Sequence, residues 1–270
     1  MNFLKYKKSF AYLFLLIACF FNYFAQAKQY PEIQACSEAG FFPFEMRTTT
    51  GKWDGYEIAL MTQFAKDSGR KIKMVDMKFD GLIPALIANK GCDVVVSAVG
   101  VNAEREKIVS FSLPTYQSAY AGIIRTTDVS KLTSFLDLNK KGIKIAVQQG
   151  TESAQYVKKY FTNTTILNFD DNSVPISAVI TKKADVYIDD SVYASIAVKR
   201  KVGKISLLNP KIFPANQADD MAFVFRKSDT KFRDEFNGFF KKIQKNGELK
   251  KLQKSYFEEM DWVKDFPENK

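Results

Sequence analysis

The sequence predicts an α/β fold in which two lobes, each a sheet covered by helices, are joined by two hinge crossings. Three observations predict it. Short β-rich runs alternate with stretches of helical periodicity, which is typical of βα units around largely parallel sheets. The length of 270 residues suits two modest lobes or one large domain. Two extended segments, 117–123 and 218–223, divide the βα units into two sets, and the second returns the chain to the first lobe.

Residues 1–27 have the pattern of an export signal. Lys5, Lys7 and Lys8 precede an apolar run at 10–21, and a small-residue cleavage motif ends at Ala27. The run is too short to span a bilayer comfortably. We expect cleavage after Ala27 and a periplasmic mature protein.

Two alternatives to this cleavage remain open. Leu16-Ile17-Ala18-Cys19 matches a lipobox, so lipidation at Cys19 would tether the mature protein to a membrane. An uncleaved membrane anchor is the third possibility.

The first lobe is predicted to hold two helices between three strands. Its strands fall at 33–37, 71–77 and 93–97. Tyr56, Leu60 and Phe64 keep the spacing of one helix face, and Gly69 offers the left-handed cap that ends this helix. Pro84 belongs to the second helix and is expected in its first turn, where proline costs no hydrogen bond.

The second lobe repeats the pattern, and the tail is helical. Strands are predicted at 143–148, 165–169, 185–188 and 205–208, with helices near 136–138, from 151 and after 190. Phe232, Phe236 and Phe240 lie on one stripe of a tail helix that is expected to pack on the core, and Gly247 separates it from a second helix. The predicted lobes are 28–120 with 221–270, and 121–220.

The composition excludes several kinds of chemistry. The chain is 46% apolar and 26% charged, as in ordinary globular proteins. It has no His, which excludes Ser-His-Asp triads, Cys-His pairs and His-based zinc sites. Removing the three signal lysines lowers the formal charge from +10 to +7. We interpret this excess as a solvated basic surface, with no nucleic-acid partner, and no motif for a metal, nucleotide or flavin cofactor occurs.

Cys36 and Cys92 are the cysteines that follow the export segment. An oxidising compartment would permit a disulfide between them. However, Cys36 falls late in one predicted strand and Cys92 just before another, so parallel neighbouring strands would hold the sulfurs at opposite ends. We therefore expect two free, buried thiols.

An ordered set of short motifs runs along the whole chain after the export segment. They are Phe42-Pro43-Phe44-Glu45, Gly55-Tyr56-Glu57, Phe79-Asp80-Gly81-Leu82-Ile83-Pro84, Glu104-Arg105, Val147-Gln148-Gln149-Gly150-Thr151 and Ala184-Asp185-Val186-Tyr187-Ile188-Asp189-Asp190. In this order they resemble the polar amino-acid solute-binding proteins of bacterial ABC importers, extracellular solute-binding protein family 3. The resemblance implies a two-lobed periplasmic-binding-protein fold that closes on a free amino acid like a Venus flytrap. It also implies a monomer that delivers its ligand to an inner-membrane permease.

The resemblance assigns the two ends of an amino-acid zwitterion to opposite lobes. Arg105 matches the family's carboxylate-binding arginine, whose planar guanidinium suits a buried carboxylate. Asp190 matches the ammonium-binding acid, although an Asp at this place also caps a helix. Thr151 and Glu152 begin a helix after Gly150, where free N–H groups favour an anionic group.

Other positions are expected to shape the pocket. Phe41 and Phe79 match aromatic walls that exclude water from the ligand. Ala98 and Gly100 match residues that contact the ligand carboxylate, but Gly100 lacks the hydroxyl that relatives carry, so backbone groups would serve. Plain core packing is the alternative role for the rings of Phe41 and Phe79.

The expected ligand is a basic amino acid such as arginine, lysine or ornithine. Glu38, Gln148 and Asp189 match positions that reach the ligand side chain, and two carboxylates there favour a cation. Glutamine is the alternative ligand. A cyclohexadienyl dehydratase-like enzyme on the same fold is the alternative function, with Glu38 or Asp189 as the acid or base.

Overall fold

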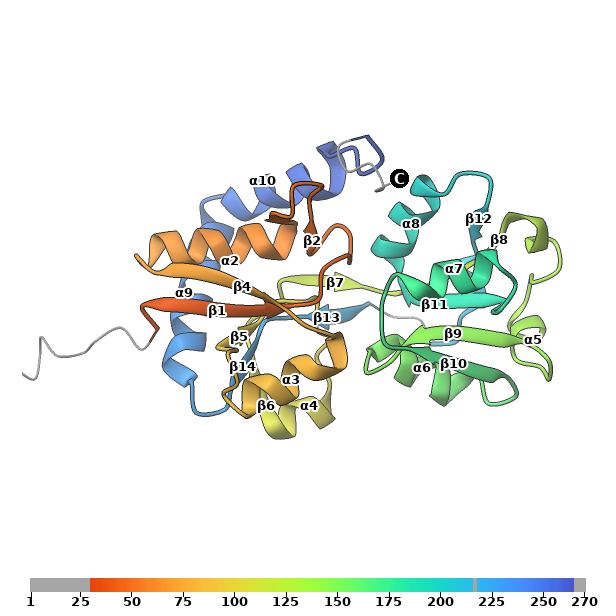
Figure 1. The fold of residues 1–270 in the computed structure, drawn as a ribbon, viewed down its shortest axis with the longest axis horizontal. Helices are drawn as coiled ribbons and strands as arrows, with labels where there is room; N and C mark the ends of the chain where they lie inside the picture. Colours follow the sequence, from red (N-terminus) through yellow and green to blue (C-terminus); the bar gives the residue numbers. More distant parts are fainter. Residues whose placement is uncertain (1–29, 216–217, 265–270) are drawn as a thin grey trace, which may run out of the picture.

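Two sheets with helices on their faces form two lobes that lie side by side (Figure 1). The computed structural model describes residues 30–215 and 218–264. The predicted export segment 1–27, with Cys19 and Ala27, lies outside the described residues. The α/β class and the two-lobed arrangement predicted from the sequence are confirmed.

The first sheet has the strand order β4-β1-β5-β14-β6. Its strands are β1 (Glu32–Ser37), β4 (Lys71–Asp76), β5 (Val94–Val95), β6 (Val109–Phe111) and β14 (Val224–Arg226). β1 pairs in parallel with β4 and β5, whereas β14 runs antiparallel between β5 and β6. The lobe therefore needs a strand from the far end of the chain to complete its sheet.

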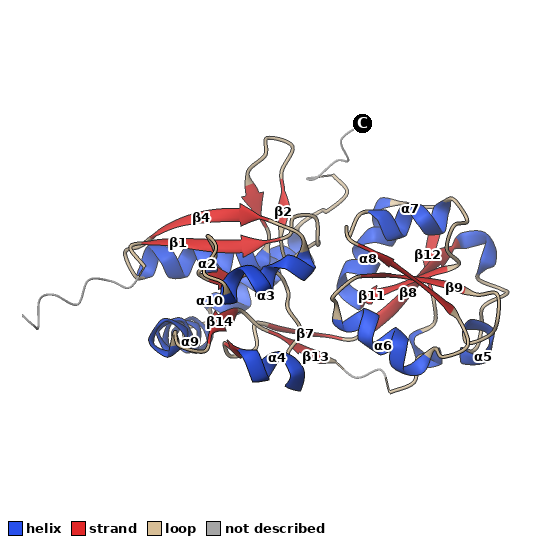
Figure 2. Ribbon diagram, turned by 60° about the horizontal axis from the view of Figure 1, so that its bottom comes forward, coloured by secondary structure: helices blue, strands red, loops and turns tan. Residues whose placement is uncertain are grey.

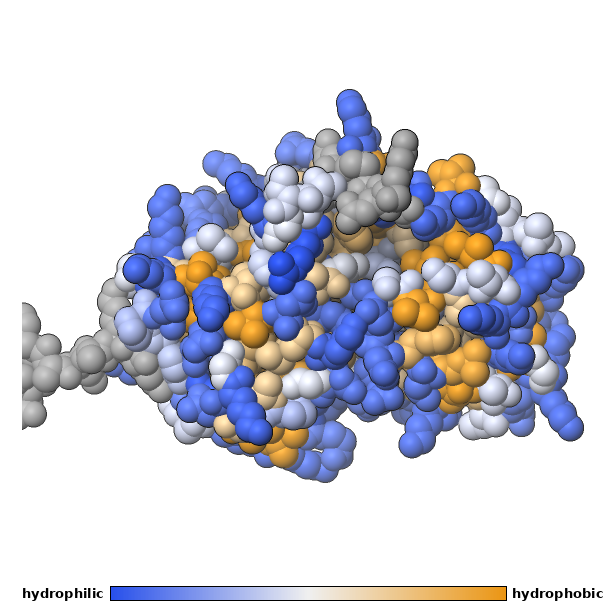
Figure 3. All heavy atoms as spheres, viewed as in Figure 1, coloured by the Kyte–Doolittle hydropathy of each residue, from blue (hydrophilic) through white to orange (hydrophobic). Residues whose placement is uncertain are grey.

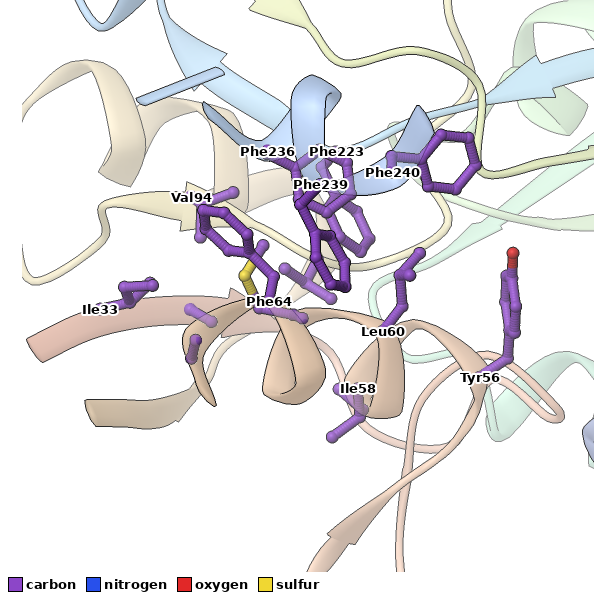
Figure 4. Packing of buried hydrophobic residues seen from close by; sticks show 14 of the residues in the cluster. Ile33, Tyr56, Ile58, Leu60, Phe64, Val94, Phe223, Phe236, Phe239 and Phe240 are labelled. Atoms are coloured by element: carbon purple, nitrogen blue, oxygen red, sulfur yellow. The ribbon is translucent and has the colours of Figure 1, made fainter. Parts of the chain in front are cut away.

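Helices cover both faces of this sheet. They are α2 (Tyr56–Asp67), α3 (Phe79–Ile87), α4 (Ala103–Ile108), α9 (Thr230–Lys245) and α10 (Glu248–Lys254), which runs on into a π-helical turn at Ser255–Glu259. Phe64 of α2 packs against Phe232, Phe236 and Phe239 of α9, as Figure 4 shows for three of these rings. These residues are buried, so the predicted core role of the tail stripe is confirmed.

The start of α3 differs from the sequence prediction. Pro84 was expected in the first turn, but the helix begins at Phe79, so Pro84 lies inside it. Pro84 has no N–H to donate to the carbonyl of Asp80, and the helix tolerates the loss of this one bond. The earlier start brings Phe79 to the N-terminal end of the helix.

The second sheet has the order β10-β9-β11-β8-β12. Its strands are β8 (Tyr120–Arg125), β9 (Lys144–Gln148), β10 (Thr165–Phe169), β11 (Val186–Asp190) and β12 (Ile205–Leu207). Its helices are α5 (Phe135–Leu138), α6 (Glu152–Tyr160), α7 (Val174–Ile180) and α8 (Ser191–Arg200), with 3-10 turns at Thr126–Asp128 and Pro210–Ile212. The sequence pattern does not predict α7, a short helix that begins beside Pro175.

The two crossings between the lobes pair with each other. β7 (Tyr116–Ser118) and β13 (Asp219–Met221) form a two-stranded antiparallel ribbon that joins the two sheets (Figure 2). A second short hairpin, β2 (Met46–Arg47) with β3 (Trp53–Asp54), lies in the first lobe. Both predicted crossings thus contain strands of one hinge ribbon, which is the architecture that permits one lobe to rotate against the other.

A disulfide joins Cys36 to Cys92, so the expectation of two free thiols is wrong. Cys36 lies beside Val95 in the sheet register, but the chain bends at Asp93, between Cys92 and β5. The two Cα atoms are therefore 5.6 Å apart, within disulfide reach. The bridge ties β1 to the segment that enters β5.

Polar and charged side chains cover most of the face shown in Figure 3, and separate apolar patches lie between them. Large exposed apolar side chains include Leu136 and Val202, which are 75% and 81% exposed. Among residues 30–215 and 218–264, no helix is long and apolar enough to span a bilayer.

Candidate functional site

A cavity lies between the two lobes. Its lining residues are Glu38, Phe41, Glu45, Phe79, Ser97, Ala98, Gly100, Ser118, Tyr120, Gln148, Thr151, Glu152, Ser153, Asn172, Asp189, Asp190, Asp219 and Met221. The cavity has a volume of about 60 Å³, several times the space that one water molecule needs. Ten of the eleven predicted site residues line this cavity, and Arg105 does not.

Strand ends supply many of the lining side chains. Glu38 directly follows β1, Gln148 ends β9, and Asp189 and Asp190 end β11. Because β1 and β5 run in parallel in one lobe and β9 and β11 in the other, their carboxyl ends gather at one edge of each sheet. The two edges face each other across the cavity, which explains why residues far apart in the sequence meet there.

The lining is strongly acidic. Six carboxyl side chains line the cavity: Glu38, Glu45, Glu152, Asp189, Asp190 and Asp219. None of the described residues that line it is Lys or Arg. Burial raises the pKa of Glu38 and of Asp189 to about 7, and that of Asp190 to about 6. Burial also raises the pKa of Glu45, which is fully enclosed, well above its usual range.

Two carboxylate oxygens in the cavity have no hydrogen-bond donor among the described residues. Gln148 donates to one oxygen of Glu38, but Glu38 Oε1 finds no hydrogen-bond partner among residues 30–215 and 218–264. The exposed ammonium of Lys78 forms a long ion pair with that oxygen, at 3.9 Å, and a closer one with Asp171. Ser97 Oγ donates to Glu45 Oε1 at 3.2 Å, which leaves Glu45 Oε2 unpaired in the described part of the chain. Such buried acceptors are costly unless a donor arrives.

Asp190 caps helix α8. One of its carboxylate oxygens accepts hydrogen bonds from the backbone N–H groups of Val192, at 2.8 Å, and Tyr193, at 3.0 Å. The cap holds the carboxylate at the cavity surface in a fixed orientation. The capping role that the sequence suggested is therefore present, together with a place on the cavity lining.

The two predicted aromatic walls line the cavity. The ring of Phe41, from the first lobe, stacks on the ring of Tyr193, from the second, with centroids 4.7 Å apart and an interplanar angle of 14°. Phe79 lies 5.8 Å from the guanidinium carbon of Arg105, measured from its ring centroid. Both rings are half-buried, so each packs against protein on one side while it lines the cavity.

Arg105 is directed at protein groups rather than at the cavity. Its Nη1 donates to the carbonyl of Gly100 at 2.6 Å, and its Nη2 donates to the carbonyl of Gly150 at 2.7 Å. Nη1 also lies 2.8 Å from Glu152 Oε1, an ion pair that crosses from the first lobe to the second. The Asn102 amide donates to the same Glu152 oxygen. The side chain of Arg105 is only 10% exposed.

Sequence reasoning missed several lining residues. These are Glu45, Ser97, Ser118, Tyr120, Ser153, Asn172, Asp219 and Met221. Glu45 ends the motif Phe42-Pro43-Phe44-Glu45. An acidic residue directly after an aromatic run near a strand end could have indicated a place on the cavity lining. Asn172 lies just before α7, the helix that was itself missed. Asp219 and Met221 come from the hinge strand β13, whose place beside the cavity only the fold shows.

A model of the bacterial extracellular solute-binding proteins, family 3, matches residues 33–259. The chain belongs to this family. The family-3 protein is 25% identical to the L-arginine-binding protein of Pseudomonas aeruginosa over 82% of this chain and 85% of that one. It is 30% identical to the arginine-binding extracellular protein ArtP of Bacillus subtilis, over 82% and 84% of the two chains.

A solved structure gives the same result for the fold of this family-3 protein. It is that of AncCDT-1, an ancestral amino acid-binding protein and precursor of cyclohexadienyl dehydratase. The match has a TM-score of 0.78 at 29% identity and covers 84% of this chain and 96% of that one. The relatives in these comparisons are amino-acid-binding proteins, and family 3 is an extracellular family that works with ABC transporters.

Proposed function

We propose that this protein is the extracytoplasmic receptor of an ABC importer and that its cleft binds a basic solute of the amino-acid type, such as arginine, lysine or ornithine. One observation carries the choice of a basic ligand: six carboxyl groups line the cavity, and no Lys or Arg of the described residues does. The arginine-binding relatives agree with this choice.

The charge of the lining explains why a cation is needed. Carboxylates gathered at buried positions in one cavity repel each other and are poorly hydrated, so burial keeps their pKa values high. A cationic ligand supplies N–H donors to the unpaired oxygens of Glu38 and Glu45 and neutralises part of the charge. Net binding near 1 µM corresponds to about 8 kcal/mol. Glutamine, the alternative ligand, supplies amide donors but no positive side chain.

We propose that binding closes the lobes about the hinge ribbon. The moving bodies would be residues 28–120 with 221–270, and residues 121–220. β7 and β13 supply the bending segments, and Phe41 and Tyr193 meet across the closing cleft. Contacts from both lobes to one ligand favour the closed state. The proposed receptor acts as a monomer and releases its ligand to the inner-membrane permease.

The dehydratase alternative has less support from the cavity. Glu38 and Asp189, with pKa values of about 7, have the proton affinity that an acid or base needs. However, prephenate is a dicarboxylate, and an acidic lining opposes its entry. We therefore expect no loss of prephenate or arogenate in the presence of the protein.

Isothermal titration calorimetry tests the proposed ligand class. Arginine, lysine, ornithine, histidine, glutamine and glutamate would be compared on ligand-stripped protein. We expect the basic ligands to bind most tightly and Glu38→Gln to weaken them by about 10- to 100-fold, because one desolvated carboxylate partner is lost. Glu104→Gln, which changes an exposed acid on α4, is the matched control. Tightest binding of glutamate or glutamine would overturn the charge argument.

A further inference from the structure

An ion pair between Arg105 and Glu152 joins the two lobes beside the cavity. Glu152 begins α6 in the second lobe and lines the cavity, whereas Arg105 lies on α4 in the first lobe behind the lining. Glu152 Oε1 lies 2.8 Å from Arg105 Nη1 and accepts a hydrogen bond from Asn102 as well. The guanidinium of Arg105 is thus already paired with a carboxylate of the protein, that of Glu152.

The chain makes room for this carboxylate at Gly100. A Cβ atom at position 100 would lie 2.4 Å from Glu152 Cγ and 3.5 Å from its Cβ. Any residue larger than glycine would therefore push the Glu152 side chain away from its place over the backbone of the first lobe. Gly100 of the first lobe and Glu152 of the second lobe are thus sterically complementary. The absence of a side chain at position 100 allows the Glu152 side chain to take this position.

Two N–H groups of Arg105 donate to backbone carbonyls. Nη1 and Nη2 donate to the carbonyls of Gly100 and Gly150, so both terminal nitrogens point at protein oxygens. A ligand carboxylate that approaches Arg105 Nη1 would compete with Glu152 and would meet the remaining acidic side chains of the lining at close range. A ligand that carries only positive charge meets neither obstacle.

We propose that Glu152 takes the place of a ligand carboxylate on Arg105, so that the cleft selects cations without a carboxylate, namely amines and guanidines, over the corresponding amino acids. This inference rests on the proposed function, because it assumes that the cleft receives a basic ligand. Glu152 is then a specificity-determining residue, because its carboxylate supplies the negative charge that the carboxylate of an amino acid would otherwise bring to Arg105.

Matched ligand pairs test the inference. Arginine with agmatine, lysine with cadaverine, and ornithine with putrescine differ only in the carboxylate. The calorimetry is done at pH 8, because Glu38 and Asp189, with pKa values of about 7, are mostly ionised there. On the wild-type protein we expect each amine to bind about tenfold or more tightly than its parent amino acid. An amino acid that binds more tightly than its amine in all three pairs would overturn the inference.

Two variants separate the role of Glu152 from a general loss of fold. Glu152→Gln removes the charge with little change of shape, and Gly100→Ala displaces the side chain while the charge stays. Both should free Arg105 and shift the amine-to-amino-acid affinity ratio by about tenfold or more towards the amino acids. Glu104→Gln is the control and should leave the ratio unchanged. Thermal unfolding of each variant reports whether it folds.

The outcomes distinguish this inference from the proposed function. If basic amino acids bind tightly and their amines do not, the proposed function stands and the role of Glu152 fails. An affinity ratio that stays the same in folded Glu152→Gln and Gly100→Ala also overturns that role. If none of the six cations binds the folded wild-type protein, both proposals fail together.

Discussion

Buried carboxyl groups link the ligand site to the stability of the protein. Burial raises the pKa values of Glu38, Glu57 and Asp189 to about 7, from ordinary values near 4. Between these values the folded state holds protons that the unfolded chain has released. The free energy of unfolding contributed by these groups is therefore largest below pH 4 and falls as the pH rises towards 7.

Asp189→Asn should change the stability of the ligand-free protein in a pH-dependent way. Asn stays neutral, so it avoids the cost of a buried anion, and the phenol of Tyr187 keeps an oxygen to donate to. We expect the melting temperature of the variant to rise relative to wild type as the pH goes from 5 to 8. Differential scanning calorimetry across this range checks the trend, and a relative melting temperature that falls with pH would contradict it.

Single residues were predictable to different degrees. Positions such as Glu38, Gln148 and Asp190 could be assigned because they match positions of family 3. Each follows or ends a strand, and parallel strands end at one edge of a sheet, which is why these residues meet. The partner of Arg105 could not be assigned, because Glu152 comes from the other lobe and only the three-dimensional arrangement of the lobes brings the two together. The Cys36–Cys92 disulfide could not be predicted either, because it depends on a local bend before β5.

At the scale of elements, the entry into α2 fixes the segment that carries Phe41 and Glu45 to the cavity. Gly55 has φ +124°, and a Cβ atom there would lie 2.3 Å from the carbonyl oxygen of Phe44. The backbone N–H groups of Tyr56 and Glu57 donate to the carbonyls of Pro43 and Phe44 at 2.8 and 3.0 Å. Glycine is thus required by both the backbone conformation and the close approach.

Gly55→Ala should destabilise the protein by about 2–4 kcal/mol, because the backbone must shift as well as adopt a strained φ. Gly51→Ala is the matched control: Gly51 also has positive φ, at +79°, but nothing lies within 4 Å of its Cβ position. Its cost should be about 1 kcal/mol. Urea unfolding of both variants measures the difference, and equal losses would show that the contact with Phe44 does not matter.

Elements were predicted well where periodicity was strong. α2 and α9 follow clear apolar stripes, and both occur where the pattern placed them. α7 was missed because seven residues offer too few turns for a periodic pattern. The predicted start of α3 is too late, because proline is typical of the first turn of a helix, whereas this helix carries Pro84 in its interior.

At the scale of the whole molecule, the cleft holds charges that oppose closure when they are ionised. Contacts between the lobes include Gln149 with Asp80, at 3.0 Å, and Lys78 with Asp171. Mutual repulsion of the cavity carboxylates opposes these contacts. This repulsion grows as the pH rises past the pKa values of Asp190, about 6, and Asp189, about 7. The balance between open and closed forms should therefore depend on pH and on a cationic ligand.

Small-angle X-ray scattering tests this balance. At pH 8 we expect the ligand-free protein to have a larger radius of gyration than the protein saturated with a basic ligand, because the ligand neutralises the cleft. At pH 5 the ligand-free protein should lie closer to the closed form, since the same carboxyl groups are mostly protonated. Equal radii under all these conditions would contradict hinge closure driven by charge.

The path of the chain through the first sheet sets the order in which the two halves can fold during synthesis. β14 lies between β5 and β6, so a nascent chain that ends before Val224 leaves a gap in the middle of that sheet. The second sheet has all five of its strands once Leu207 has left the ribosome. The half that is translated first is thus the last to be completed.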